Sequence, residues 1–203
     1  MKKLVLFAAV VFGLSTMNAQ KNSILLGGNV GYSHTENKQG GQSQKLDSYD
    51  WSPYVGYQFS DNWTIGAKVS FAKADLGADQ LDALGLVDGN TKNQKIGGFI
   101  RYTYPFNETF AIYGDLGAGW QEQKTKGYTP FGNVESKADG FYIGFTPALF
   151  INFKNNFGLN FSIGGLEYNH LKAKNVSPSN KQDNVKVTFG NAFNVGISKN
   201  FSL

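Results

Sequence analysis

The chain has no cysteine, few prolines and few charges, and each scarcity excludes a class of structure. Without a thiol there is no disulfide, no thiolate metal site and no cysteine-anchored lipoprotein. Only 17% of the residues are charged, too few to solvate the exterior of a soluble barrel whose apolar residues point inward. The apolar run at residues 4–14, about 11 residues, is too short to cross a bilayer as a helix.

The first residues have the form of a secretory signal peptide. Lys2 and Lys3 precede the apolar run, and Ala19 supplies the small residue that a cleavage site prefers. We therefore predict a signal peptide at 1–19 and one β-barrel domain at 20–203. Removing the two lysines lowers the formal charge from +4 to about +2, which gives no basis for a nucleic-acid partner.

The rest of the chain is dominated by alternation. Eight segments alternate bulky apolar residues with small or polar ones, which is the period of a β-strand with two different faces. An even number of such strands suits a closed bacterial barrel. The predicted fold is all-β, an eight-stranded antiparallel transmembrane up-and-down β-barrel, with strands at residues 23–35, 49–59, 63–74, 94–104, 109–124, 140–153, 157–171 and 184–203.

Short and long connections follow each other in turn. The short ones are at 60–62, 105–108 and 154–156, and four loops of about a dozen residues or more begin near Glu36, Asp75, Thr125 and Lys172. Eight strands with three short turns place both chain ends on the periplasmic side and the long loops outside the cell.

The volumes of the two faces decide which one meets lipid. An eight-stranded barrel is just filled by ordinary side chains, so about four bulky residues per strand must point outward and the glycine, serine, threonine and asparagine face inward. Aromatic residues also gather near the strand ends, as expected at the two membrane interfaces. The predicted interface aromatics are Trp51, Trp63, Trp120, Tyr104, Phe110, Phe153, Phe157 and Phe201.

Two stretches carry a family resemblance. Residues 54–63 (YVGYQFSDNW) and 195–201 (VGISKNF), together with the signal peptide and tight turns, resemble the small OmpX/OmpA-type outer membrane β-barrel family. Within it, the chain looks most like single-domain porin-like proteins of Bacteroidetes-type bacteria. The resemblance covers the whole mature chain and implies an outer membrane location and insertion by the barrel-assembly machinery. One departure is Leu203, because the family's chains usually end on an aromatic residue.

Three charged residues fall on the inward face at one predicted depth. Lys68, Arg101 and Asp115 each lie about four to six residues from a short turn. The turn near Asn107 sets Arg101 opposite about Gly114, within reach of Asp115. Because an unpaired desolvated charge is costly, we predict a lumen-filling ion-pair network. The alternative is a selectivity element in a conducting pore.

The segment 157–171 contains an acid that strict alternation would aim at lipid. That acid is Glu167, and a charge at mid-depth in the bilayer is costly. A bulge at Gly164-Gly165 would turn Glu167 inward and Tyr168 outward. The alternative is that Glu167 lies above the apolar band.

A lipid A-modifying enzyme is the least favoured hypothesis. It would need a Ser/His pair near the rim, and only His34 and His170 are present. His34 points outward by parity, Ser33 points the other way, and no nucleophile motif accompanies either histidine. We therefore predict no catalytic residues, no cofactor and, since the aspartates after Ala74 lack a calcium-loop spacing, no metal.

The outward loops are the remaining candidates for function. Residues 78–84, in the longest loop, could form two helical turns as a lid or a binding surface. Lys172, Lys174 and Lys181 could meet lipopolysaccharide phosphates. We expect a monomeric, largely plugged barrel with a structural or surface-interaction role and an extracellular ligand bound through its loops. The alternative is a narrow porin-like channel for small solutes.

Overall fold

The computed structural model describes residues 21–39, 42–75, 88–153, 157–174 and 181–203. The predicted signal peptide and the predicted helical turns at 78–84 lie outside the described residues. Every regular element is a strand, and no helix among the described residues is long and apolar enough to cross a membrane.

Ten strands follow one another along the chain. They are β1 (Ser23–Gln39), β2 (Gln42–Gln58), β3 (Trp63–Asp75), β4 (Asp88–Pro105), β5 (Phe110–Thr129), β6 (Gly132–Asn152), β7 (Phe157–Ser162), β8 (Leu166–Ala173), β9 (Lys181–Val187) and β10 (Ala192–Ser202).

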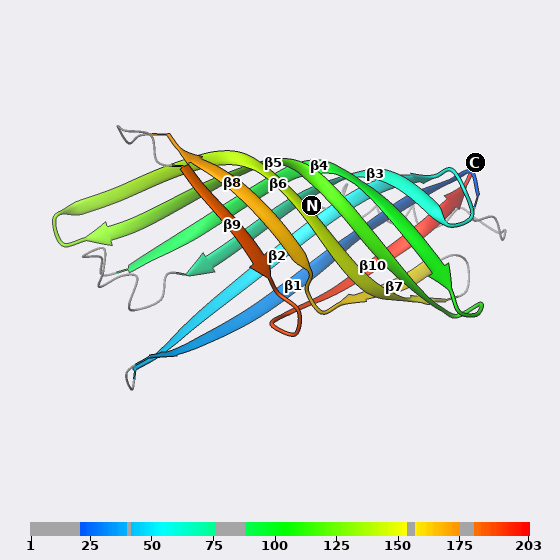
Figure 1. Cartoon of the computed structure of the whole chain (residues 1–203), viewed down its shortest axis with the longest axis horizontal. Coiled ribbons are helices and arrows are strands. Elements are labelled where there is room, and N and C mark those ends of the chain that lie inside the picture. The colour runs from blue at the N-terminus through cyan, green and yellow to red at the C-terminus, as the bar shows by residue number, and fades with distance from the viewer. Residues whose placement is uncertain (1–20, 40–41, 76–87, 154–156, 175–180) are drawn as a thin grey trace, which may run out of the picture.

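The strands close into a ring. From β1 to β7 each strand pairs antiparallel with the next, β7 pairs with β10, and β10 returns to β1 with Ser23 opposite Ser202. The two remaining strands complete the lengths of β7 and β10. β8 follows β7 along the same edge of β6, and β9 pairs with β8 and then leads into β10 (Figure 1). The predicted eight-stranded up-and-down barrel is therefore confirmed, with two of its eight strands broken.

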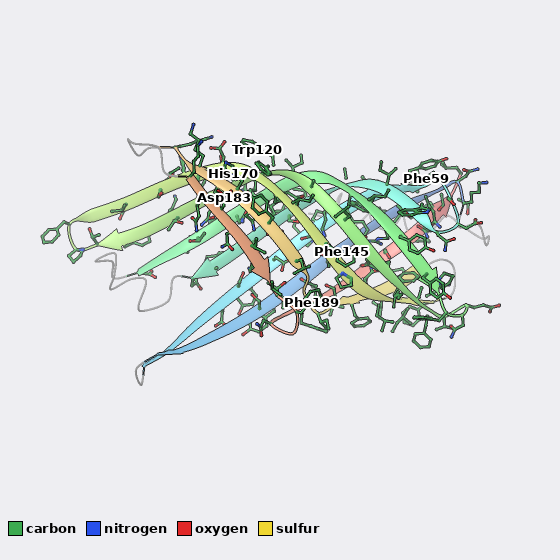
Figure 2. The ribbon with its side chains drawn as sticks, viewed as in Figure 1. Phe59, Trp120, Phe145, His170, Asp183 and Phe189 are labelled. Carbon is green, nitrogen blue, oxygen red and sulfur yellow. The ribbon has the colours of Figure 1, made fainter. Side chains whose placement is uncertain are left out.

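Bulky residues form the outside of the wall. Trp51, Ile65 and Trp120 are more than half exposed, as expected for side chains that only lipid would cover. The outer face also carries Trp63, Tyr104, Phe110, Phe153, Phe157 and Phe201. Figure 2 shows Phe59 at the end of the barrel that carries the short turns, here called the turn end, and Trp120 toward the opposite, hairpin end.

Two of the four predicted long loops are wrong. The chain near Glu36 and Thr125 continues as strand, so that β1 and β2 pair up to Gln39 and Gln42, and β5 and β6 up to Thr129 and Gly132. In the β5–β6 extension most side chains on both faces are polar, as expected beyond a bilayer, so the alternation that marks strands inside the bilayer is lost. In the β5–β6 extension, a hydrogen bond from Lys137 lowers the pKa of Glu135.

The two broken strands are interrupted side by side. β7 and β8 are separated by residues 163–165, where Gly164 has a φ of 102°, and β9 and β10 by residues 188–191, where Gly190 has a φ of 79°. The Thr188 amide donates to the Gly165 carbonyl and the Gly190 amide to the Ile163 carbonyl. The pair β8–β9 thereby bends as a unit away from the line of β7 and β10.

Candidate functional site

The inward face of the turn end is filled by a plug, defined here as Tyr54, Phe99, Arg101, Tyr113 and Asp115. All five side chains are buried. Arg101 on β4 and Asp115 on β5 are direct register partners, one residue from the predicted pairing with Gly114. Arg101 donates from Nε to Oδ1 at 2.6 Å and from Nη2 to Oδ2 at 2.8 Å, a bidentate geometry that fixes both side chains.

Aromatic rings surround the Arg101 guanidinium. Its central carbon lies 3.7 Å from the ring centroid of Tyr113, 5.1 Å from that of Tyr54 and 5.5 Å from that of Phe99. The negative ring faces add attraction to a cation that Asp115 already neutralises. The Tyr54 ring also meets Phe99 edge to face, with centroids 5.9 Å apart.

Hydrogen bonds tie the plug across the lumen. Asn160 on β7 donates from Nδ2 to the Tyr54 hydroxyl at 3.3 Å and to the Ser198 hydroxyl at 3.2 Å. These contacts link β7 and β10 to β2, which is separated from β10 by β1 along the wall. Tyr54 was not among the residues selected from the sequence, although the alternation of residues 49–59 predicts that its side chain points into the lumen.

Glycines make room for the rings inside the wall. A Cβ on Gly66 would lie 2.6 Å from the Phe99 ring, and a Cβ on Gly158 would lie 2.0 Å from the Phe150 ring. The small residues on the inward face therefore accommodate the large ones, and the turn-end lumen is packed with side chains.

The lumen widens at the hairpin end into a cavity of about 490 Å³. Its wall is made mainly of amide, hydroxyl and charged side chains, with Phe99 and Asp115 of the plug at its inner limit. Gln121 is almost fully buried there, and its Oε1 has no partner among the described residues. The charged side chains that line the cavity are Asp50, Lys68, Lys95, Asp115, Glu167 and Lys186.

Glu167 points into this cavity. It lies just beyond the break at Gly164-Gly165 and accepts a hydrogen bond from the Lys95 ammonium on β4 at 2.5 Å. Tyr168 faces outward, where its ring contacts Phe141 at 6.0 Å. The break thus reverses the parity of β8 relative to β7, which keeps a carboxyl side chain out of lipid.

Lys68 is also in the cavity but is separate from the Arg101–Asp115 pair. No carboxylate of the described residues lies within 4.0 Å of its ammonium nitrogen. It is instead within electrostatic range of Asp50 and Asp115. The structure therefore brings together two of the three charged residues selected from the sequence. It adds Asp50, Lys95 and Lys186, which the alternation of the sequence also places on the inward face but which were not selected.

His170 is the histidine whose side chain is described, and it lies at the hairpin-end rim. His170 faces outward, accepts or donates at Nδ1 to Asp183 at 2.8 Å, and stacks on Phe141 with centroids 5.1 Å apart. Asp183 also accepts from the Tyr168 hydroxyl. Figure 2 shows His170 and Asp183 together at the hairpin-end rim. The His34 side chain lies outside the described side chains, and the described residues hold no cluster of metal-ligating groups.

An apolar exterior, a closed ring of strands and a polar, partly plugged lumen define a transmembrane β-barrel. The chain belongs to the outer membrane protein β-barrel domain family, whose model matches residues 4–201. No match was found among curated proteins.

Several solved structures are similar to this chain. OprG of Pseudomonas aeruginosa is 15% identical, with a TM-score of 0.53 over 92% of this chain and 99% of that one. Ail, the attachment invasion locus protein of Yersinia pestis, is 20% identical, with a TM-score of 0.48 over 89% and 99%. Neisserial surface protein A is 15% identical, with a TM-score of 0.48 over 88% and 97%. The similarity to OprG indicates the fold, and the family match indicates a bacterial outer membrane location.

Proposed function

We propose that this protein is a non-conducting outer membrane barrel that acts at the cell surface through its hairpin end. The observation that carries the proposal is the plug, in which a neutralised arginine is packed against three aromatic rings across the lumen. A buried ion pair of this geometry is costly to break. Side-chain motion alone therefore does not open a path for ions through the lumen. The proposal includes a monomeric state and an N-terminal signal peptide that is removed.

Planar-bilayer recording of the refolded protein tests this proposal. We expect no stepwise conductance from the native protein. The triple variant Tyr54→Ala, Phe99→Ala, Tyr113→Ala removes the rings but keeps the ion pair, and we expect it to conduct. Steps of defined size from the native protein, with ion selectivity that changes in Arg101→Met, would instead support the narrow channel.

The narrow channel remains the second candidate because of one observation. The cavity at the hairpin end is polar and large enough to hold water and small solutes. A solute would then have to pass the plug, so transport requires the Arg101–Asp115 pair to move aside. Liposome swelling with small sugars distinguishes the two candidates, since a plugged barrel leaves the vesicles shrunken.

The outer face suggests phosphate-bearing lipid as a partner. Four lysines share one register row across four strands: Lys73, Lys92, Lys124 and Lys137 are successive partners on β3, β4, β5 and β6. The row lies just beyond Phe71, Trp120 and Phe141, where lipid head groups begin. Like charges directly opposite one another repel, and nearby carboxylates offset three of the four.

Lipopolysaccharide phosphates would complete this neutralisation. We therefore propose that the row holds the barrel against the outer leaflet and sets its depth. The triple variant Lys92→Gln, Lys124→Gln, Lys137→Gln should bind lipopolysaccharide micelles more weakly and with a smaller salt dependence. Lys21→Gln, at the turn end, is the matched control and should leave binding unchanged; equal loss in both variants would contradict the proposal.

A further inference from the structure

One strand edge of the barrel wall has no partner among the residues that the structure describes. β9 pairs with β8 along one edge, and no pairing joins its other edge to any described strand. β1 pairs with β10 only as far as Ser33 opposite Ala192, and from His34 to Gln39 it pairs with β2 alone. In Figure 1 the β8–β9 pair and the outer ends of β1 and β2 diverge. The facing edges of β9 and outer β1 are here called the lateral opening.

The lateral opening reaches the depth of the hydrocarbon. Val185 shares a register row with Tyr168 and Ile143, and Val187 shares one with Leu166 and Phe145. Both valines face outward and are 67% and 60% exposed. Polar side chains first appear on the outer face one row farther out, with His170 and Asp183. Figure 2 shows Phe189 at the inner end of β9 and Phe145 on the neighbouring wall.

An open strand edge cannot face hydrocarbon alone. Each unsatisfied backbone group in lipid costs several kcal/mol, so such edges are found only where they border protein or water. Directly behind β9 lies the polar cavity, which Gln182, Asn184 and Lys186 of β9 help to line. The edge therefore forms a boundary between the water-filled cavity and the acyl chains of the bilayer. An amphiphile fits such a boundary, because its head group is polar and its chain is apolar.

The charges in the cavity indicate the sign of the head group. Asp50 lies within electrostatic range of Lys68, Lys95 and Lys186, and Lys95 is already paired with Glu167. With Asp115 neutralised by Arg101, three lysines face two carboxylates. No carboxylate of the described residues lies within 4.0 Å of the Lys186 nitrogen. A group with one negative charge would balance the cavity.

We propose that the lateral opening admits an anionic amphiphile from the outer leaflet, its head group bound in the cavity near Lys186 and Lys68 and its acyl chain left in the bilayer between β9 and β1. The amide and hydroxyl groups of the wall, including the unpartnered Oε1 of Gln121, supply hydrogen bonds to oxygens and hydroxyls of the head group. The plug closes the inner limit, so the head group is held and not passed through.

Equilibrium binding to the protein in phosphatidylcholine vesicles tests the chemistry. Radiolabelled dodecyl phosphate should bind saturably, one per barrel, whereas dodecyl maltoside, with the same chain and no charge, should not compete. Lys186→Gln should weaken binding about tenfold, which is about 1.4 kcal/mol. Lys181→Gln, on the outward face of the same strand, is the matched control and should bind as the native protein does. Competition by dodecyl maltoside, or equal loss in both variants, would overturn the proposal.

A second measurement tests the route and needs no variant. A phospholipid with a nitroxide on its head group should broaden the backbone amide signals of Asn184 and Lys186 more than those of Gly117 and Gln121, which line the cavity from the sealed wall. Equal broadening at all four would mean that head groups stay outside the opening. Displacement of dodecyl phosphate by inorganic phosphate at equal concentration would show entry from water and would also overturn the proposal. Conductance decides the non-conducting proposal separately, so the two can fail independently.

Discussion

The turn end and the hairpin end of the barrel differ in how completely their strands are paired and their lumen is packed. At the turn end every strand has two partners and the lumen is packed by the plug, so backbone and side chains are both satisfied within the protein. At the hairpin end, one edge of β9 has no partner among the described strands, and the lumen holds a polar cavity. We therefore expect stability to be concentrated at the turn end and binding to take place at the hairpin end.

The largest effect should come from breaking the plug. Asp115→Ala leaves the Arg101 guanidinium buried without its counterion, and we expect a loss of about 3–5 kcal/mol in the free energy of unfolding. Urea unfolding in lipid vesicles, followed by tryptophan fluorescence, measures it. The double variant Arg101→Met, Asp115→Leu should recover most of this loss. A loss below about 1 kcal/mol in Asp115→Ala would show that the pair is hydrated.

A charge placed on the outer wall compares the sealed ring with the lateral opening. Leu116→Arg, on the paired wall, should cost about 2–4 kcal/mol, as expected for arginine near the middle of a bilayer. Val187→Arg should cost less than half as much, because the side chain can turn its guanidinium into the wet opening. Unfolding in vesicles of the same lipid measures both, and equal costs would show that β9 is sealed.

The break in β7–β8 depends on a residue without a side chain. Gly164 has a φ of 102°, and a Cβ there would lie 2.1 Å from the Thr188 carbonyl oxygen. Gly164→Ala should therefore destabilise the barrel by about 1–3 kcal/mol through backbone strain. Gly98→Ala is the control, since its nearest atom would be 3.5 Å away. A neutral Gly164→Ala would indicate that the strand straightens without cost.

The smallest effect is expected in the hairpin extensions. Glu135 on β6 forms ion pairs with Lys137 at 2.9 Å and Lys126 at 3.6 Å, all of them exposed to solvent. Exposed pairs contribute little because water screens them. Glu135→Gln should leave the urea midpoint unchanged, and a clear drop would mean that the extension is part of the cooperative unit.

Period-two alternation was sufficient to predict the barrel, because lipid outside and packed side chains inside impose opposite demands on successive residues. The same parity placed Arg101 and Asp115 on the inward face, and the two glycines before Glu167 marked a break. The second break, at 188–191, was not predicted. Val185, Val187, Phe189 and Phe193 continue the alternation across it, and only the pairing partners show that the strand bends.

The hairpin extensions were missed for a different physical reason. Beyond the bilayer both faces of β5 and β6 meet water, so no difference between the faces remains in the sequence, and the strands persist through their register alone. The plug was only partly predicted because parity tells which way Tyr54 points but not which rings meet across the lumen. That depends on strand stagger around the whole ring.

The seam between β1 and β10 joins residues from opposite ends of the chain, with Ile24 beside Phe201. A ribosome finishes β10 last, so no partial product can complete the cylinder, and every earlier stage exposes two unsatisfied edges. The ring therefore cannot be sealed before both β1 and β10 are present, whatever the order in which the other strands pair.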